Sequence, residues 1–197
     1  MTKGKSKGSA FERELCKQLS LWWTNGERDD VYIRSVNSGG YATVRASKGL
    51  SSFMQSGDIT FNDPIGIPLI KFFSIEAKTG YKEADMNTFL WRSSKAKTHK
   101  LEDFFIQSHR DSLKSNTYSW CVIHRQIRKA AIIYMPFKIH KKLIRIKGMP
   151  ATSYFNLRIK RGLGEWNIVS MNLIDFLEWI DKETILLLLE KSVPRNT

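Results

Sequence analysis

The stretch IPLIKFFSIEAK, residues 67–78, constrains the fold more than any other part of the sequence. Its apolar residues follow one another as they do in a long strand that is buried on both faces of a sheet. Residues 9–23 and 100–113 instead carry apolar side chains at helical spacing, three or four residues apart. The sequence therefore predicts an α/β fold in which helices flank a central β-sheet.

The segment before this strand predicts a hairpin. GDITF starts a strand at Gly57, and NDPIG has the composition of a turn, so we expect an antiparallel pair around Asn62–Gly66. Residues 36–56 are rich in Gly and Ser and predict a long loop, while 137–146 fit a helix or a strand. The remaining patterns predict strands at 30–36, 118–125, 129–135, 152–159 and 166–171, and one or two helices over 172–191.

This order of elements predicts a single domain over residues 1–197. We expect a core over about residues 5–135, followed by a basic C-terminal α+β extension over about 136–197.

The charge of the chain indicates a polyanionic partner. The net charge is +13, and between Ser112 and Gly164 there are twelve Lys and Arg and no Asp or Glu. Solubility does not require so long a stretch without acid, so we expect nucleic acid, with an anionic membrane surface as the weaker alternative.

Several other classes of protein are not indicated. No apolar run approaches the ~18 residues of a membrane span, and no signal peptide follows the basic N-terminus. Cys16 and Cys121 stand far apart and predict neither a disulfide framework nor a zinc ribbon. We therefore expect a cytoplasmic or nucleoid-associated protein with no membrane partner.

Three charged residues mark a candidate site. In the strand that ends SIEAK, Glu76 and Lys78 point to one face while Ala77 packs into the core. The predicted hairpin places Asp58 beside Glu76, and two neighbouring carboxylates repel unless a cation lies between them. Oxygen ligands suit Mg²⁺ or Mn²⁺, and a nearby lysine positions an attacking water and offsets charge on phosphate. A surface salt bridge among the same three residues explains the pattern equally well at this point.

The N-terminal helix adds a resemblance. KGSAFEREL, from Lys7, followed by Arg34, then Asp58 and then EAK, resembles the archaeal-type Holliday-junction resolvases of the PD-(D/E)xK, or restriction-endonuclease-like, nuclease superfamily. The resemblance implies a mixed-sheet core, a divalent metal, and a homodimer that cuts branched DNA. The departures are Gly57 in place of proline, the long insert after Arg34, and the C-terminal extension.

The resemblance also assigns roles to residues. It implies a metal bound by Asp58, Glu76, the Ala77 carbonyl and Glu12, with Lys78 as the catalytic lysine. It implies that Arg13, Arg34 and Ser35 face the phosphate. Viewed alone, Glu12 is also the acidic half of a capping box with Ser9, and Arg13 and Arg34 fit an exposed surface.

Further residues are candidates for DNA contact. Tyr81 and Trp91 lie among basic residues and are candidates for stacking on bases. The basic stretches at 92–100 and 138–147 are expected to bind the DNA backbone without reading its sequence. The individual candidates are Lys82, Lys141, Lys142, Arg145 and Lys147.

The sequence thus predicts a Mg²⁺-dependent DNA endonuclease, with Mn²⁺ as a substitute, acting on branched or double-stranded DNA. Two alternatives stay open: a repair, replication or restriction-type nuclease on duplexes or ends, and a DNA-binding protein that does not cut.

Overall fold

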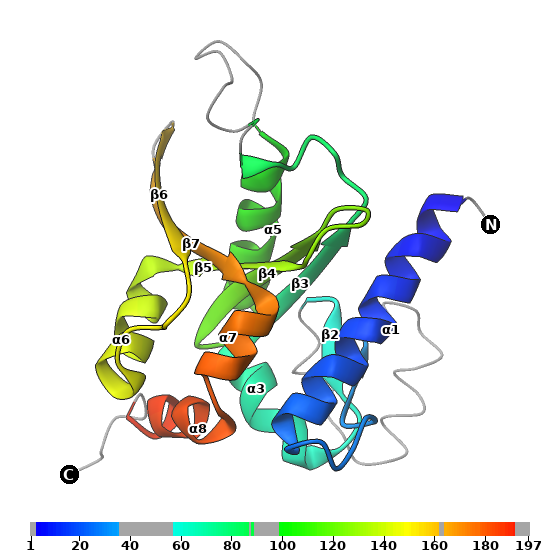
Figure 1. The fold of residues 1–197 in the computed structure, drawn as a ribbon, viewed down its shortest axis with the longest axis vertical. Helices are drawn as coiled ribbons and strands as arrows, with labels where there is room; N and C mark the ends of the chain where they lie inside the picture. Colours follow the sequence, from blue (N-terminus) through cyan, green and yellow to red (C-terminus); the bar gives the residue numbers. More distant parts are fainter. Residues whose placement is uncertain (1–2, 36–56, 87, 89–98, 162–163, 192–197) are drawn as a thin grey trace.

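The computed structural model describes residues 3–35, 57–86, 88, 99–161 and 164–191 (Figure 1). The N-terminal half contains these elements: α1 (Lys3–Trp23), β1 (Tyr32–Arg34), β2 (Ile59–Phe61), η2 (Pro64–Gly66), α3 (Ile67–Phe72), β3 (Phe73–Thr79) and α5 (Lys100–Lys114). The C-terminal half contains these: β4 (Ser119–Arg125), β5 (Ile132–Pro136), α6 (Phe137–Lys147), β6 (Tyr154–Arg161), β7 (Gly164–Asn172), α7 (Leu173–Trp179) and α8 (Lys182–Glu190).

The central sheet is mixed, as predicted. Its strand order is β3-β4-β5-β7-β6, in which β3 and β4 are parallel and the other neighbours are antiparallel. Helix α5 makes the crossover between the two parallel strands. The segment after residue 136 adds β6 and β7 to this same sheet, and residues 137–146 fold as helix α6.

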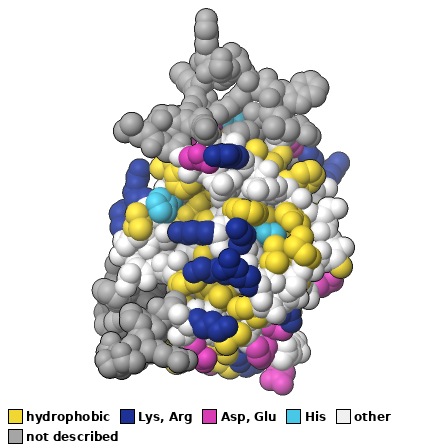
Figure 2. Space-filling model, turned by 90° about the vertical axis from the view of Figure 1, so that its left-hand side faces the viewer, with side chains coloured by type: hydrophobic (Ala, Val, Ile, Leu, Met, Phe, Trp, Pro, Cys, Tyr) yellow, Lys and Arg dark blue, Asp and Glu magenta, His cyan; other side chains and the backbone are white. Residues whose placement is uncertain are grey.

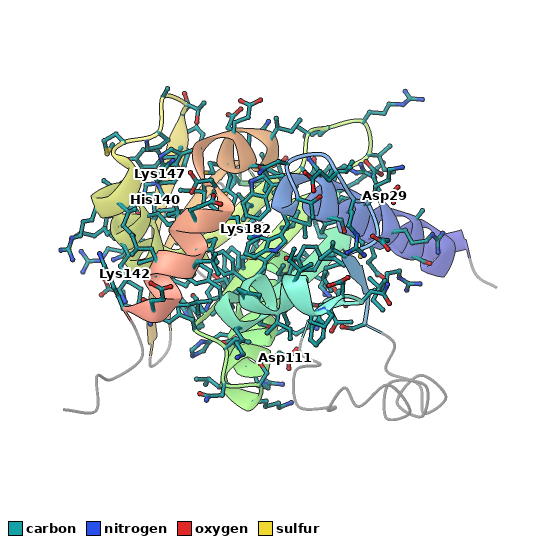
Figure 3. The ribbon with its side chains drawn as sticks, turned by 90° about the horizontal axis from the view of Figure 1, so that it is seen from below. Asp29, Asp111, His140, Lys142, Lys147 and Lys182 are labelled. Carbon is teal, nitrogen blue, oxygen red and sulfur yellow. The ribbon has the colours of Figure 1, made fainter. Side chains whose placement is uncertain are left out.

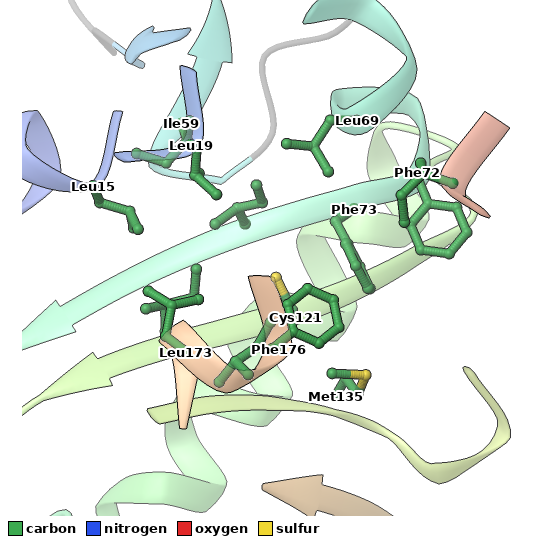
Figure 4. Packing of buried hydrophobic residues seen from close by; sticks show 14 of the residues in the cluster. Leu15, Leu19, Ile59, Leu69, Phe72, Phe73, Cys121, Met135, Leu173 and Phe176 are labelled. Carbon is green, nitrogen blue, oxygen red and sulfur yellow. The ribbon is translucent and has the colours of Figure 1, made fainter. Parts of the chain in front are cut away.

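Alternate residues of the strands face two different cores. Helix α5 covers one face, where Phe104 and Phe105 pack against Trp120 and Val122 of β4. The other face carries α1, α3, α6, α7 and α8, with Leu15, Leu69, Leu143, Phe176 and Leu188 in one cluster (Figures 1 and 4). Both faces of β3 and β4 are therefore covered, which accounts for the nearly continuous apolar sequence of β4.

The hairpin predicted from residue 57 is wrong, and the long strand predicted for residues 67–78 is confirmed only over 73–78, within β3. Residues 67–72 form helix α3, and β2 pairs with β1 instead of β3. Two prolines account for the difference: Pro64 and Pro68 lie in the first turns of η2 and α3, where a fixed φ and a missing N–H favour a helix start. The Asp63 carboxylate caps η2 by accepting from the Ile65 N–H.

Helix α1 is longer than predicted at its start. It begins at Lys3, so Ser9 lies inside the helix and the predicted N-cap at Ser9 is wrong. The helix ends at Trp23 and is followed by Asn25 and Gly26, which both have positive φ, and the Gly26 N–H donates to the Leu21 carbonyl. In the part of the chain that is described, no helix combines the length and the apolar character that crossing a bilayer requires.

Candidate active site

Strand β3 supplies the central pair of the site. Glu76 and Lys78 lie on the face covered by α5, and Ala77 between them packs into the opposite core, as predicted. The Glu76 side chain is only 2% exposed and that of Lys78 is 16% exposed. A carboxylate buried to this degree must have polar partners, because a buried charge without them is strongly unfavourable.

Asp58 reaches this pair by a route other than a hairpin. Gly57 forms an isolated parallel bridge with Ile75, and the Asp58 N–H donates to the Ile75 carbonyl at 2.8 Å. The Ala77 N–H in turn donates to Asp58 Oδ2 at 2.9 Å. The short segment 57–58 therefore lies along the outer edge of β3 and places the Asp58 carboxylate beside Glu76.

Gly57 makes this close approach feasible. Its φ is +79°, and a Cβ built on it would lie 2.4 Å from the Ile75 carbonyl oxygen. Real Cβ atoms essentially never come so close. A residue with a side chain would push the segment away from β3, so glycine here serves the position of the next residue, Asp58.

The Lys78 ammonium is the cation that the two carboxylates share. Its Nζ contacts Glu76 Oε1 directly and lies 3.9 Å from Asp58 Oδ2. It also lies 5.7 Å from the centre of the Phe104 ring, whose face favours a cation. The result is one lysine held between two acids and an aromatic ring.

The pKa values follow from this burial. Burial, reinforced by the charge of Asp58, raises the pKa of Glu76 to about 7. Burial also raises the pKa of Asp58, although Lys78 and the Ala77 N–H oppose the rise. For Lys78, burial by itself would lower the pKa, but Glu76 and Asp58 outweigh it and the pKa is raised. Lys78 therefore keeps its charge at neutral pH, while Glu76 gains or loses its proton near neutral pH.

Gln107 is a member of the site that the sequence analysis missed. Its Nε2 donates to Glu76 Oε1 at 2.6 Å from helix α5. Asp111, one turn further along α5 and labelled in Figure 3, adds negative potential that contributes to the raised pKa of Glu76. One signal was present: Gln107 stands three residues after the buried Phe104, on a helix that packs over β3.

Glu12 and Arg34 form an ion pair at the margin of the site. Arg34 Nε contacts Glu12 Oε2, and the negative charge of Glu12 raises the pKa of Asp58, so Glu12 lies within electrostatic reach of the acidic pair. Because Ser9 is not an N-cap, the capping-box explanation of Glu12 is wrong. The hydroxyl of Ser9 instead accepts from the Arg13 guanidinium, which is exposed. Ser35 is partly buried and its N–H donates to the Asp58 carbonyl.

The predicted DNA-contact residues lie in two separate places. Lys82 is exposed shortly after β3, and its carbonyl accepts from Gln126. The others lie on α6, across the sheet, where Lys and Arg side chains gather in a column (Figure 2): Lys141, Lys142, Arg145 and Lys147. Lys142 contacts the Tyr118 hydroxyl and Lys147 pairs with Asp181 (Lys142 and Lys147 are labelled in Figure 3). Trp91 and residues 92–98 lie outside the described residues.

The residues at the site fit a divalent cation. Within the described ranges, no three side chains of His, Cys, Asp or Glu converge on one point. Asp58 and Glu76 nevertheless form a close pair of oxygen donors that attracts a positive charge, as the position of Lys78 demonstrates. Mg²⁺ is commonly held by one or two carboxylates and several waters, which agrees with this donor set.

Comparison with known proteins agrees with this geometry. No curated protein and no solved structure gave a match. One protein family matches over residues 3–187, nearly the whole chain, and its description reads "phage putative PDDEXK endonuclease". The fold, a mixed sheet flanked by helices, agrees with the restriction-endonuclease-like core of that superfamily. The chain therefore belongs to this PDDEXK family and is a nuclease of the PD-(D/E)xK superfamily.

Proposed function

We propose that the protein is a Mg²⁺-dependent DNA endonuclease whose cleavage site is formed by Asp58, Glu76 and Lys78, with Mn²⁺ as a substitute. The observation that carries this proposal is a pair of carboxylates, buried Glu76 and partly exposed Asp58, that shares a single ammonium group. A structural salt bridge with Lys78 needs only one carboxylate, whereas two neighbouring carboxylates repel each other and favour a divalent cation between them.

Three groups of this chain would hold the cation: the carboxylates of Asp58 and Glu76 and the main-chain carbonyl of Ala77. When bound, such an ion polarises a phosphate oxygen and lowers the pKa of a bound water. Gln107 fixes the orientation of the Glu76 carboxylate by its hydrogen bond to Oε1. Glu12 completes the acidic margin of the site, and its ion pair with Arg34 holds that guanidinium where it faces phosphate.

Lys78 acts on the reacting groups. Because its pKa is raised, it stays protonated at neutral pH and donates hydrogen bonds. We assign to it the orientation of the attacking water and the neutralisation of the charge that develops on the phosphoryl oxygens. Phe104 limits the positions of the ammonium through its ring.

Matched variants test this assignment. Asp58→Asn and Glu76→Gln keep the side-chain size and remove a ligand charge, so cleavage of DNA with Mg²⁺ should vanish while DNA binding persists. Lys78→Ala should slow cleavage by ~10²–10³-fold, as for the loss of one transition-state stabiliser. Glu27→Gln, an exposed acid outside the site, is the control and should cut normally. Normal cleavage by Asp58→Asn would place the active site elsewhere.

The finer substrate assignment is branched DNA cut by a homodimer. It rests on the resemblance of the α1 and β3 motifs to junction resolvases, because symmetric cutting of a four-way junction needs two active sites. The test compares four-way, forked, duplex and single-stranded DNAs of matched sequence. A preference for plain duplexes or ends, or a monomer of about 22.8 kDa under active conditions, would favour the alternative nuclease classes. A wild type that binds DNA but cuts none of these with any divalent metal would favour the non-catalytic alternative.

A further inference from the structure

A cavity of about 460 Å³ lies beside α5, away from the acidic pair. Its walls combine aromatic rings, among them Tyr118, Trp120 and Trp166, with several polar side chains. The Trp120 and Trp166 rings meet edge to face at 6.0 Å, and His109 meets Trp166 in the same way at 5.4 Å. Trp120 is only 3% exposed, whereas Trp166 and His109 are partly exposed, and a planar ligand stacks on exposed aromatic faces.

The polar groups of the cavity suit a nucleotide. Lys138 lines it from the first turn of α6, a turn with no acidic residue and no side-chain cap at Pro136. Ser119 also lines it, is only 5% exposed, and its Oγ has no hydrogen-bond partner among the described residues. Among the described residues that line this cavity, the one carboxylate is that of Glu165, which is already paired with Arg158.

Helix α5 separates this cavity from the cleavage groups. Gln107 contacts Glu76, whereas His109 lines the cavity, and two residues on a helix point about 200° apart. The two sites therefore lie on opposite sides of one helix, which is roughly 10–12 Å wide with its side chains. A nucleotide in the cavity would thus be a few positions away from the phosphate being cut.

We propose that this cavity holds an unpaired nucleotide of the DNA strand, with its base against Trp166 and His109 and its phosphate beside Lys138 and the first turn of α6. The choice of DNA rests on the proposed function; the choice of an unpaired nucleotide rests on the cavity. A paired base keeps its faces stacked within the duplex and cannot enter an aromatic pocket of this kind.

Binding measurements on the full-length Asp58→Asn protein test the proposal without cleavage. The probes are a labelled, 5′-phosphorylated oligothymidylate and a blunt duplex, followed by fluorescence anisotropy. Trp166→Ala and Lys138→Ala should each weaken oligothymidylate binding by roughly tenfold, as expected for one stacked base or one charged contact, and should leave duplex binding nearly unchanged. Trp166→Phe keeps an aromatic ring and should restore most of the affinity.

The controls are matched in kind. Phe155→Ala removes an exposed aromatic ring from the same sheet, and Lys71→Ala removes an exposed lysine from α3; both should bind as the parent does. The proposal would be overturned if all these variants bound oligothymidylate with equal affinity. It would also be overturned if Trp166→Ala and Lys138→Ala lost as much affinity for the duplex as for oligothymidylate. Competition by thymidine 5′-monophosphate as strong as that by the oligonucleotide would show a free-nucleotide site and overturn the assignment to a strand. Because no cleavage enters the readout, failure here is distinct from failure of the nuclease proposal.

Discussion

Replacing Gly57 by alanine tests whether a close backbone approach positions Asp58. The added Cβ would lie 2.4 Å from the Ile75 carbonyl oxygen and 2.9 Å from its carbonyl carbon and its nitrogen. Relief of these contacts requires the segment to move away from β3 by about 1 Å. That movement breaks the 2.8 Å hydrogen bond from the Asp58 N–H to Ile75, which contributes about 1 kcal/mol to stability.

The left-handed backbone adds a second cost. At a φ of +79°, alanine is less favourable than glycine by about 1–2 kcal/mol. The two effects together predict a loss of about 2–3 kcal/mol in the free energy of unfolding, measured by urea titration. A displacement of Asp58 by about 1 Å should also slow cleavage by ~10²-fold even where the protein is fully folded.

Gly148→Ala separates these two causes. Gly148 has a similar φ of +78°, but a Cβ there meets nothing within 4 Å. This control should lose only the part of the free energy of unfolding that comes from the left-handed backbone, and it should cut DNA at the normal rate. If both alanine variants lose the same stability and both cleave normally, the contact between Gly57 and β3 does not position Asp58 for cleavage.

Three further outcomes follow from the site and the charged surface. Glu12→Gln removes the charge of the ion pair with Arg34, and we expect a folded protein that cleaves poorly; near-normal cutting in a steady-state assay would reduce Glu12 to a structural role. In the folded protein without metal, the pKa of Glu76 is about 7, above the ordinary 4.5, so the folded state binds more protons than the unfolded chain between these two pH values. The free energy of unfolding should therefore fall as pH rises from about 4.5 to about 7. Urea titrations in chelator should show that Glu76→Gln makes this fall smaller. Neutralising Lys141, Lys142 and Arg145 together should weaken DNA binding alike for all sequences and make it less salt-dependent, and an unchanged salt slope in anisotropy titrations would remove α6 from the DNA-contact surface.

The sequence predicted the strands and helices best where apolar periodicity was undisturbed. The helix that ends at Trp23, the strand after residue 118 and the helix from Lys100 all follow from period and length. The stretch 67–72 was misjudged because a buried helix and a buried strand look alike in a continuous apolar run, and Pro68 was the discriminating residue. Ser9 was misjudged because a helix start was assigned to a residue that has capping chemistry but lies inside α1.

The candidate site shows a similar division. The spacing in SIEAK fixes which side chains share a face, so Glu76 and Lys78 could be placed together from sequence alone. Asp58 reaches them through the parallel bridge at Gly57, a contact between segments that local patterns do not encode. Gln107 likewise comes from a separate helix, and only the packing of α5 over β3 brings its amide to Glu76.

The position of α6 limits what its lysines do. Glu76 and Lys78 lie on the α5 face of β3, at one edge of the sheet, whereas α6 packs on the opposite face and connects β5 to β6 near the other edge. A phosphate at the acidic pair therefore cannot also contact Lys141 or Arg145, because the sheet lies between them. If these residues bind DNA, they bind a part of the substrate other than the phosphate being cut, such as a second arm of a branched substrate or a more distant part of a bent duplex. Their contribution should accordingly disappear on short linear DNA and be retained on long or branched DNA, which makes substrate length the variable that reveals their role.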